Sequence, residues 1–336
     1  MRILIDAFGG DNAPEEIIAG TIEALRQNQK FTAVLVGDQA IIEEKLSGYN
    51  YDKSRVEIMH APDVITCEEE PTVAIRTKPN SSIAVAFKAL KTDDEASAFV
   101  SAGSTGAVLV GATLKLGRIS GVNRPALCPI LPTLIDGKNV LLLDSGANAD
   151  CKAINLTQFA VMGSAYAKAM GVENPKVALL SNGTEDEKGN ALNHEVFPLL
   201  KEDKNINFVG NIEARDILSG EYDVVVTDGF SGNVALKSLE GAVGVVLKSL
   251  KNGIKSSFSS KIGALFMRKT FKQLKGKLDY NKKGGALFIG VTKPVVKAHG
   301  SSKREAIKNA VLQAVSYCEK DVCGQIKLGI NGVIGE

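Results

Sequence analysis

The feature that most constrains the fold is the regular alternation of short apolar runs with helical stretches over more than two hundred residues. Runs typical of buried strands lie at residues 2–6, 32–37, 55–59, 98–101, 140–144, 177–180, 206–209 and 224–227. Apolar residues at helical spacing mark residues 14–26, 81–91, 106–116, 156–170 and 233–250. This alternation predicts a doubly wound, three-layer α/β/α fold with a mainly parallel sheet. No linker or repeat divides the chain, so we expect one domain over residues 1–336.

Polar, glycine-rich loops follow five of the predicted strands, at residues 6–11, 101–106, 144–150, 182–190 and 227–233. Ligands of open α/β sheets bind at the carboxyl ends of the strands, so we expect all five loops at that edge. Glycine lets the backbone approach an anion, and the N–H groups that open the next helix attract negative charge. One such loop is more typical of a tight turn. Five together predict a polar site of phosphate size.

Several motifs with sharper signatures do not occur. The sequence has no GxxxxGK[ST], no GxGxxG after the first strand and no GxSxG, which disfavours a nucleotide, a dinucleotide and a hydrolase-type serine. Its three histidines are widely separated, so no HExxH or zinc-finger spacing exists, and we predict no metal and no other cofactor. With a net charge of +2 and 5% aromatic residues, the chain is not expected to bind nucleic acid.

The cysteines and the start of the chain bear on its compartment. Five cysteines without a CxxC pair and an N-terminus that enters a strand directly predict a reduced, cytoplasmic protein. No apolar run reaches the ~18 residues that a membrane-spanning helix needs.

Residues 248–283 form a basic stretch with eleven Lys and Arg against one acid, so it carries +10 and the rest of the chain −8. It contains apolar residues spaced to form one helical stripe: Ile254, Phe258, Ile262, Leu265 and Phe266. An ordinary helix would dock such a stripe on its own core. The concentrated positive charge instead favours an interfacial segment on anionic lipid, or contact with an acidic protein partner.

Taken in order, the loop motifs resemble the PlsX-type phosphate acyltransferases over essentially the whole chain. The resemblance rests on IDAFGGDNAP, SAGSTGA, LDSGAN, EDEKGN, VTDGFSGNVALK and LDYNKKGGALFIGVTKPVVKAHGSS. The chain departs from the usual pattern at Ser104, where the family has Asn, at Ser145, where it has a branched apolar residue, and at residues 181–183.

The resemblance implies a fold related to isocitrate dehydrogenase and phosphotransacetylase, and a homodimer in the cytoplasm. It implies an enzyme that makes acyl phosphate from acyl-[acyl carrier protein] and inorganic phosphate for phospholipid synthesis, without a metal. The family also implies peripheral attachment to the membrane, and the basic stretch matches the region that makes this contact.

The same resemblance implies that Lys188 of the KGN loop and Asn233 of the SGN loop are catalytic. Our hypothesis is that Lys188 holds phosphate, while Asn233 donates a hydrogen bond to the thioester oxygen as it becomes an oxyanion. The ordinary alternatives are a solvated loop lysine for Lys188 and the N-cap of a helix over residues 234–250 for Asn233. The remaining predicted phosphate- or substrate-binding residues are Asp6, Asn12, Gly103, Ser104, Thr105, Gly106, Asn148, Gly229, Ser231 and Gly232.

Two other functions remain open at this point. One is a phosphotransacetylase-like enzyme that uses acyl-coenzyme A on the same fold. The other is a non-catalytic scaffold on the membrane, in which the basic stretch is the function. An acyl-carrier enzyme predicts a long apolar tunnel, whereas a coenzyme A enzyme needs a site for the adenine nucleotide.

Overall fold

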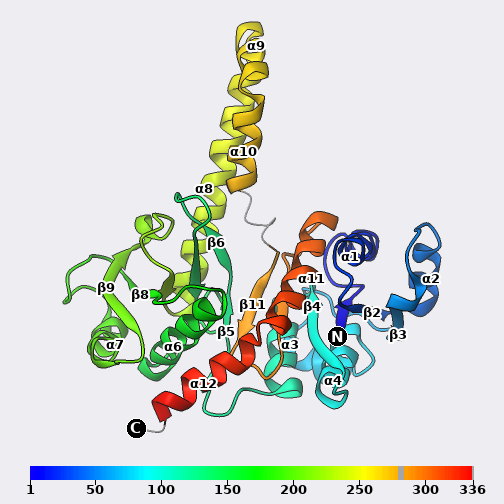
Figure 1. Cartoon of the computed structure of the whole chain (residues 1–336), viewed down its shortest axis with the longest axis horizontal. Helices are drawn as coiled ribbons and strands as arrows, with labels where there is room; N and C mark the ends of the chain where they lie inside the picture. The colour runs from blue at the N-terminus through cyan, green and yellow to red at the C-terminus, as the bar shows by residue number, and fades with distance from the viewer. Residues whose placement is uncertain (279–283, 335–336) are drawn as a thin grey trace.

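The computed structural model describes residues 1–278 and 284–334, and within them the strands form two sheets. The first sheet has seven strands in the order β3 (Val56–His60), β2 (Thr32–Gly37), β1 (Arg2–Asp6), β4 (Ala96–Ser101), β12 (Val295–Lys297), β11 (Ala286–Ile289) and β5 (Ala126–Cys128). The second has five, in the order β6 (Ile130–Pro132), β7 (Asn139–Leu143), β10 (Val224–Val226), β8 (Lys176–Ser181) and β9 (Asn207–Glu213). Figure 1 shows the two sheets side by side.

Most neighbouring strands are parallel, as predicted; the exceptions are the two pairings of β11 and the pairing of β6 with β7. The eight predicted strands all occur, with ends moved by a few residues, but they are divided between two sheets. β5, β6, β11 and β12 were not predicted, because each is short and has proline or glycine within it or next to it, whereas the equally short β10 is an uninterrupted run of valines. The chain leaves the first sheet after β5 and returns to it through β11 and β12.

Helices cover both sheets. They are α1 (Glu15–Gln27), α2 (Gln39–Leu46), α3 (Pro71–Thr77), α4 (Ser82–Thr92), α5 (Thr105–Val110), α6 (Ala153–Ala169), α7 (Ala191–Glu202), α11 (Arg304–Glu319) and α12 (Val322–Ile334). A π-helical turn, Gly111–Leu116, continues α5, and 3₁₀ turns lie at Lys53–Arg55 and Ala214–Asp216.

One hydrophobic core joins the two halves. Ile3 of the first sheet, Leu143 of the second, Phe159 of α6 and Tyr317 of α11 belong to the same buried cluster. The hydroxyl groups of Tyr317 and Tyr166 of α6 share a hydrogen bond, and their rings meet edge to face with centroids 5.4 Å apart. The shared core therefore sets how the sheets face each other.

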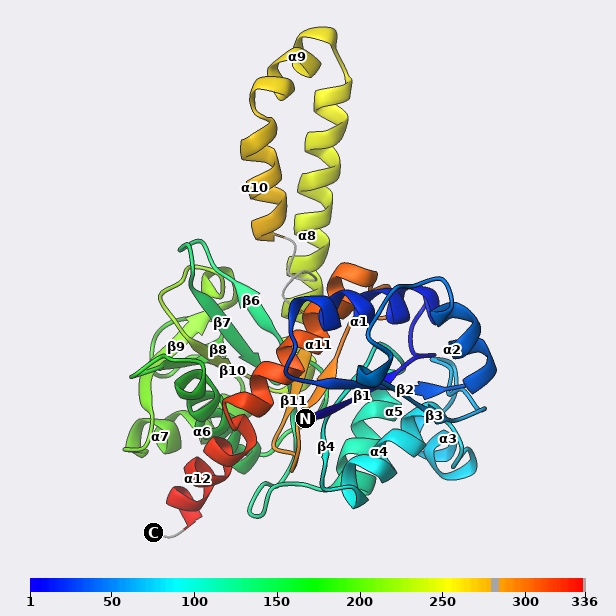
Figure 2. The same cartoon turned by 45° about the vertical axis from the view of Figure 1, so that its right-hand side comes forward.

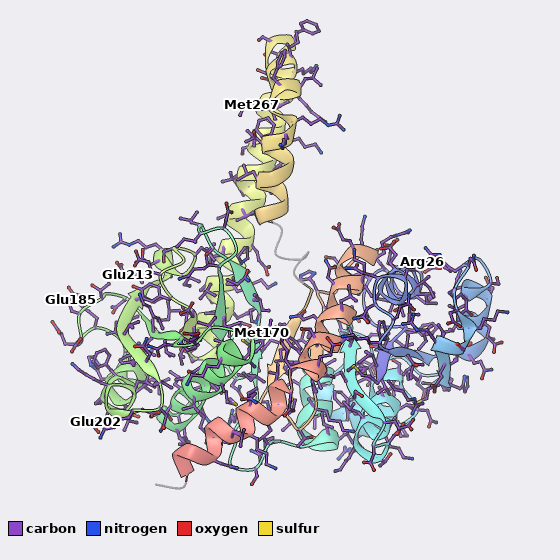
Figure 3. All side chains as sticks on the ribbon, in the orientation of Figure 1. Arg26, Met170, Glu185, Glu202, Glu213 and Met267 are labelled. Atoms are coloured by element: carbon purple, nitrogen blue, oxygen red, sulfur yellow. The ribbon has the colours of Figure 1, made fainter. Side chains whose placement is uncertain are left out.

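Three helices form an extension from this body: α8 (Gly229–Lys255), α9 (Phe258–Phe266) and α10 (Arg268–Leu278). We call residues 244–278 the helical hairpin; it projects well beyond the two sheets (Figures 1 and 2). Met267, which follows α9, lies in its outer part (Figure 3). None of the helices in the described part of the chain is long and apolar enough to cross a membrane.

The predicted apolar stripe is not continuous, because the helix breaks at Ser256–Ser257 and again at Met267. Ile254 lies in α8 and lines a hollow between α8 and α10 with Phe271, so it is not part of the outer surface of the tip. The other four lie in α9 and are exposed, with exposed fractions of 78% for Phe258, 42% for Ile262, 70% for Leu265 and 87% for Phe266. Residues 279–283 of the predicted basic stretch lie outside the described residues.

Candidate active site

Two cavities flank the first turns of α8. One, of about 380 Å³, lies between the halves and is lined by Asn233 and Lys237 of α8, Ser145 after β7, Thr105 of α5 and residues 297–300 after β12. We call it the cleft cavity. The other, of about 740 Å³, lies within the second half against Ser231 and Val234 of α8 and is also lined by Asn182, Gly189 and Asn190. We call it the side cavity.

The start of α8 positions Asn233. Asp228 is the N-cap, and its carboxylate accepts a hydrogen bond of 2.8 Å from the backbone N–H of Ser231. The helix therefore begins at Gly229, earlier than predicted, and Asn233 lies inside it. The N-cap alternative for Asn233 is wrong, because Asp228 already satisfies the first turn. The Asn233 side chain is exposed and faces the cleft cavity.

Close packing at two glycines holds α8 against the loop after β7. A Cβ atom at Gly232 would overlap the carbonyl oxygen of Asp144, and one at Gly229 would lie 2.5 Å from the carbonyl oxygen of Asn148. Only glycine fits such an approach of backbone to backbone. The contact places Asn233 beside Gly146 of the same loop, on the wall of the cleft cavity.

Three backbone N–H groups of this turn have acceptors within the chain. Gly229 donates to the carbonyl oxygen of Asn148 (2.8 Å), Gly232 donates to that of Asp228 (3.0 Å), and Ser231 is bonded to the Asp228 carboxylate. These contacts show packing and capping, and the substrate-binding role of Gly229, Ser231 and Gly232 stays a prediction. The side chain of Ser231 lines the side cavity.

Asn148 is also structural. Its side chain is buried, and its amide group donates to the carbonyl oxygen of Pro125 (2.8 Å) and to the carboxylate of Asp144 (2.9 Å). Burial raises the pKa of Asp144, while hydrogen bonds from the backbone of the loop oppose this shift. Asn148 therefore shapes the loop, and its predicted substrate contact stays a prediction.

The loop after β1 contacts the loops that border the cleft cavity but does not line the cavity itself. Asp6 is buried, accepts a hydrogen bond of 2.7 Å from the Ser101 hydroxyl, and has a pKa raised by burial. The Ser101 hydroxyl oxygen in turn accepts from the N–H of Gly103 (3.0 Å), so this amide is not free for an anion. Asn12 donates to the carbonyl oxygens of Ser301 and Ser302, at 3.2 and 3.3 Å. Asp6 and Asn12 line neither cavity.

Only one residue of the neighbouring SAGSTG loop lines the cleft cavity. Ser104 caps α5 by accepting from the N–H of Ala107 at 3.4 Å, a role that serine and asparagine share. Gly106 packs against Pro71, where a Cβ atom would lie 2.5 Å from the proline ring. Thr105 lies between them, is exposed, and lines the cleft cavity.

Lys188 is exposed and lines neither cavity, whereas the next two residues, Gly189 and Asn190, line the side cavity. Its N–H donates to the carbonyl oxygen of Glu185 (3.0 Å), and Glu185 lies at the outer edge of the second half (Figure 3). The structure thus places the KGN loop and Asn233 on opposite faces of α8. Within one chain, the two predicted catalytic residues do not meet in one cavity.

Three basic residues at the cleft cavity were missed: Lys237, Lys297 and His299. Lys237 forms an ion pair with Glu240 (2.8 Å), and Nδ1 of His299 lies 2.8 Å from the Ser301 hydroxyl. The available signal was the run Val295–Lys297 followed by His299 and Gly300, a short strand that ends in a cation before a turn. This three-residue strand directly follows Pro294 and was not recognised.

The described residues of the site provide neither a reactive thiol nor a cluster of metal ligands. Burial raises the pKa of Cys151 to about 11, which keeps it a thiol near neutral pH, and its sulfur lies 3.5 Å from the carbonyl oxygen of Asn148. Among residues 1–278 and 284–334, no group of three or more His, Cys, Asp or Glu is placed to hold a metal ion.

Comparison with known proteins gives a consistent result. Residues 1–325 match a family described as fatty acid synthesis protein. The chain is 46% identical over 330 residues to the phosphate acyltransferase of Clostridium novyi, which covers 97% of this chain and 98% of that protein. It is 47% identical over 323 residues to the phosphate acyltransferase of Bacillus cereus, covering 96% of each.

Among solved structures, the fold is similar to a phosphotransacetylase from Streptococcus pyogenes, with a TM-score of 0.62 and 17% sequence identity over 96% of this chain and 94% of that one. A phosphotransacetylase from Staphylococcus aureus is similar, with a TM-score of 0.58 and 16% identity over 95% and 94%. These likenesses confirm the predicted fold class.

Proposed function

The chain belongs to the fatty acid synthesis protein family and is a phosphate acyltransferase, and from this premise we propose that it takes a fatty acyl group from acyl carrier protein. The acceptor is inorganic phosphate, and the product is acyl phosphate for phospholipid synthesis. The proposed enzyme works in the cytoplasm as a homodimer at the membrane surface.

The proposed reaction joins an oxygen of HPO₄²⁻ to the thioester carbonyl carbon. The carbon–sulfur bond then breaks, and the proton lost by phosphate passes to the departing thiolate. Phosphate is already a nucleophile, so the protein mainly has to position the reactants and stabilise the negative charge that develops on the carbonyl oxygen. The exposed amide of Asn233, on the wall of the cleft cavity, is the donor that we assign to this oxygen.

The observation that supports a fatty acyl donor is an apolar slot next to the cleft cavity. The slot has a volume of about 180 Å³ and is lined by Leu131, Leu218, Leu239 and Val243. Leu236 of α8 borders both the slot and the cleft cavity. An acyl chain whose carbonyl lies near Asn233 would have apolar surface along α8, which favours a fatty acyl donor over a small one.

The helical hairpin supports attachment to a membrane surface. Four exposed apolar side chains of α9 lie at its tip within a strongly basic segment, which suits an interface of acyl chains below anionic headgroups. Along its shaft, Val245 and Val246 have exposed fractions of 66% and 61%. Two adjacent exposed valines on this helix support a second copy packed against α8.

The decisive experiment measures acyl phosphate formed from inorganic phosphate with acyl-[acyl carrier protein], and with the matching acyl-coenzyme A in parallel. We expect product from the carrier-bound donor. Product from coenzyme A thioesters alone would favour the phosphotransacetylase alternative. No product from either donor, with vesicle binding intact, would favour the scaffold.

A paired variant tests the slot. Val243→Phe places a ring in the slot and should lower turnover of long acyl donors more than that of short ones. Val73→Phe is the matched control, because Val73 of α3 is exposed and does not line the slot. Equal effects of Val243→Phe on all chain lengths would remove the slot as the acyl site.

A further inference from the structure

A buried lysine faces the cleft cavity. Lys297 is the last residue of β12, has an exposed fraction of only 8%, and lines the cavity with Asn233. Lysine is almost never buried without a partner for its charge. Within the described part of the chain, the one hydrogen bond recorded for its ammonium group is to the carbonyl oxygen of Ala298.

The fold explains how Lys297 reaches this place. β12 runs parallel to β4, with Lys297 opposite Ser101, so both strands end at the same edge of the first sheet. β4 also pairs with β1, on the side away from β12, and the strand order reverses between β1 and β4. The carboxyl ends of strands at such a reversal are where open α/β sheets bind their ligands.

Two further basic residues lie around the same cavity. Lys237 faces it from α8, where it is paired with Glu240, and His299 follows Lys297 by two residues. The pKa of Lys297 is lowered to about 8, mainly by burial and to a smaller extent by the positive charge of Lys237, whereas Cys67, Asp6 and Asp11 oppose the shift. Burial also lowers the pKa of His299, so its imidazole is mainly neutral near pH 7. The cavity therefore has a lysine ammonium group on each of two walls and an imidazole beside them.

We propose that Lys297 binds the attacking inorganic phosphate in the cleft cavity, with Lys237 and His299 completing the pocket. The proposal rests on the proposed function and identifies the cation that binds the phosphate acceptor of that reaction. A phosphate dianion offsets the repulsion between the ammonium groups of Lys297 and Lys237, and a buried ammonium binds phosphate strongly because little water competes. The phosphodiester of a pantetheine arm carries a single charge and suits this cluster less well.

The arrangement brings the two reactants together. Lys297 lies on the wall formed by the first sheet, and Asn233 lies on the wall formed by α8. Phosphate held by Lys297 therefore faces a carbonyl oxygen held by Asn233, across one cavity of about 380 Å³. Lys188, which the sequence assigned to phosphate, does not line this cavity.

The first test measures binding of inorganic phosphate to the full chain by calorimetry, without an acyl donor. Lys297→Met keeps most of the side-chain length and removes the charge; it should weaken phosphate binding by about 10- to 100-fold. Lys297→Arg keeps the charge and should restore part of the affinity. Lys168→Met, at an exposed position on α6, is the matched control and should bind as the unaltered protein does.

The second test uses turnover. Lys297→Met should raise the KM for phosphate by a similar factor and leave the KM for the acyl donor within about twofold. Lys237 is more exposed and lies on the opposite wall of the cavity. Lys237→Met therefore tests the cluster if Lys297→Met fails to fold. It should raise the KM for phosphate to a smaller extent than Lys297→Met does.

Unchanged phosphate affinity in a folded Lys297→Met protein would overturn the proposal. So would a raised KM for the acyl donor alone, which would assign Lys297 to the phosphodiester of the donor. If the unaltered protein binds phosphate through Lys297 but makes no acyl phosphate, the site stands and the proposed function fails.

Discussion

The two ends of α8 have opposite environments. At its N-terminus, Gly229 and Gly232 are buried against the loop after β7, and they are the only buried residues among the 27 of the helix. At its C-terminus, the helix enters the hairpin, where Val245 and Val246 are exposed and the α9 tip carries exposed Phe258 and Phe266. One continuous helix thus connects a closely packed site to an exposed apolar surface.

The two ends of α8 therefore differ in the contacts that hold them in place. The N-terminal end is determined within the chain, because the contacts that position Asn233 are all present in it. Within the described part of the chain, the apolar side chains at the other end are exposed, and surface of this kind is typical of sites that bind a membrane or another protein. The predictions below test one end or the other.

The largest effect is expected at the N-terminal end. Asn233→Ala should lower kcat by about 10²–10³-fold, the typical loss when one oxyanion donor is removed. The thermal midpoint should change little, because the side chain is exposed. Val234→Ala is the control, since Val234 faces the side cavity. Equal loss in both variants would show that α8 is disturbed as a whole.

Lys188→Ala tests the opposite face of α8. The family resemblance predicts that this variant folds and loses most of its turnover. Because Lys188 and Asn233 do not meet within one chain, we expect a joint site to need a second copy. Mixing inactive Lys188→Ala and Asn233→Ala proteins should then recover about a quarter of the activity, as one intact site forms in each mixed dimer. No recovery would mean that Lys188 acts within its own chain.

Lys297→Met should stabilise the protein near pH 7. Burial lowers the pKa of Lys297 from 10.5 to about 8, so below pH 8 the charged lysine is less favourable in the folded state. This shift corresponds to about 3 kcal/mol of unfolding free energy. The gain should shrink as the pH rises from about 8 towards 10.5, where the lysine of the folded protein is already neutral. Denaturant titrations at pH 7 and pH 10 measure it; Lys188→Met, at an exposed position, should show no such change.

A pair of glycine substitutions compares the two ends directly. Gly232→Ala should destabilise the protein by about 1–3 kcal/mol or more, because the added methyl group overlaps the backbone of Asp144. Gly244→Ala meets no atom within 4 Å and should stabilise the helix by up to about 1 kcal/mol. Chemical denaturation gives both values. A destabilising Gly244→Ala would reveal a partner packed closely on the hairpin.

The smallest effect is expected at the tip. Phe266→Ser removes an exposed apolar side chain and should weaken binding to anionic vesicles by about tenfold, measured by co-sedimentation. Turnover of a soluble donor should not change. The control is Val73→Ser, which removes an exposed apolar residue of α3, far from the hairpin in sequence. Unchanged vesicle binding by Phe266→Ser would remove the tip from the membrane contact.

Periodicity predicted eight strands and the helices between them, because each is an uninterrupted run or a repeated pattern of apolar residues. It did not reveal β11 and β12, and with them it missed Lys297. These two short strands are bordered by glycine or proline, which interrupts the apolar pattern, and their place beside β4 and β5 depends on the whole chain. The loops were found as a group, but several of their amides already have acceptors within the chain.

The sequence by itself determined the fold class, the family and the loop that carries Asn233, because these depend on local pattern and on motifs read in order. Only the tertiary structure decided which residues share a cavity. Burial of Lys297 follows from the pairing of β12 with β4, and separation of Lys188 from Asn233 follows from the packing of α8 on Asp144. Such contacts join residues far apart in the chain, so local sequence pattern does not reveal them.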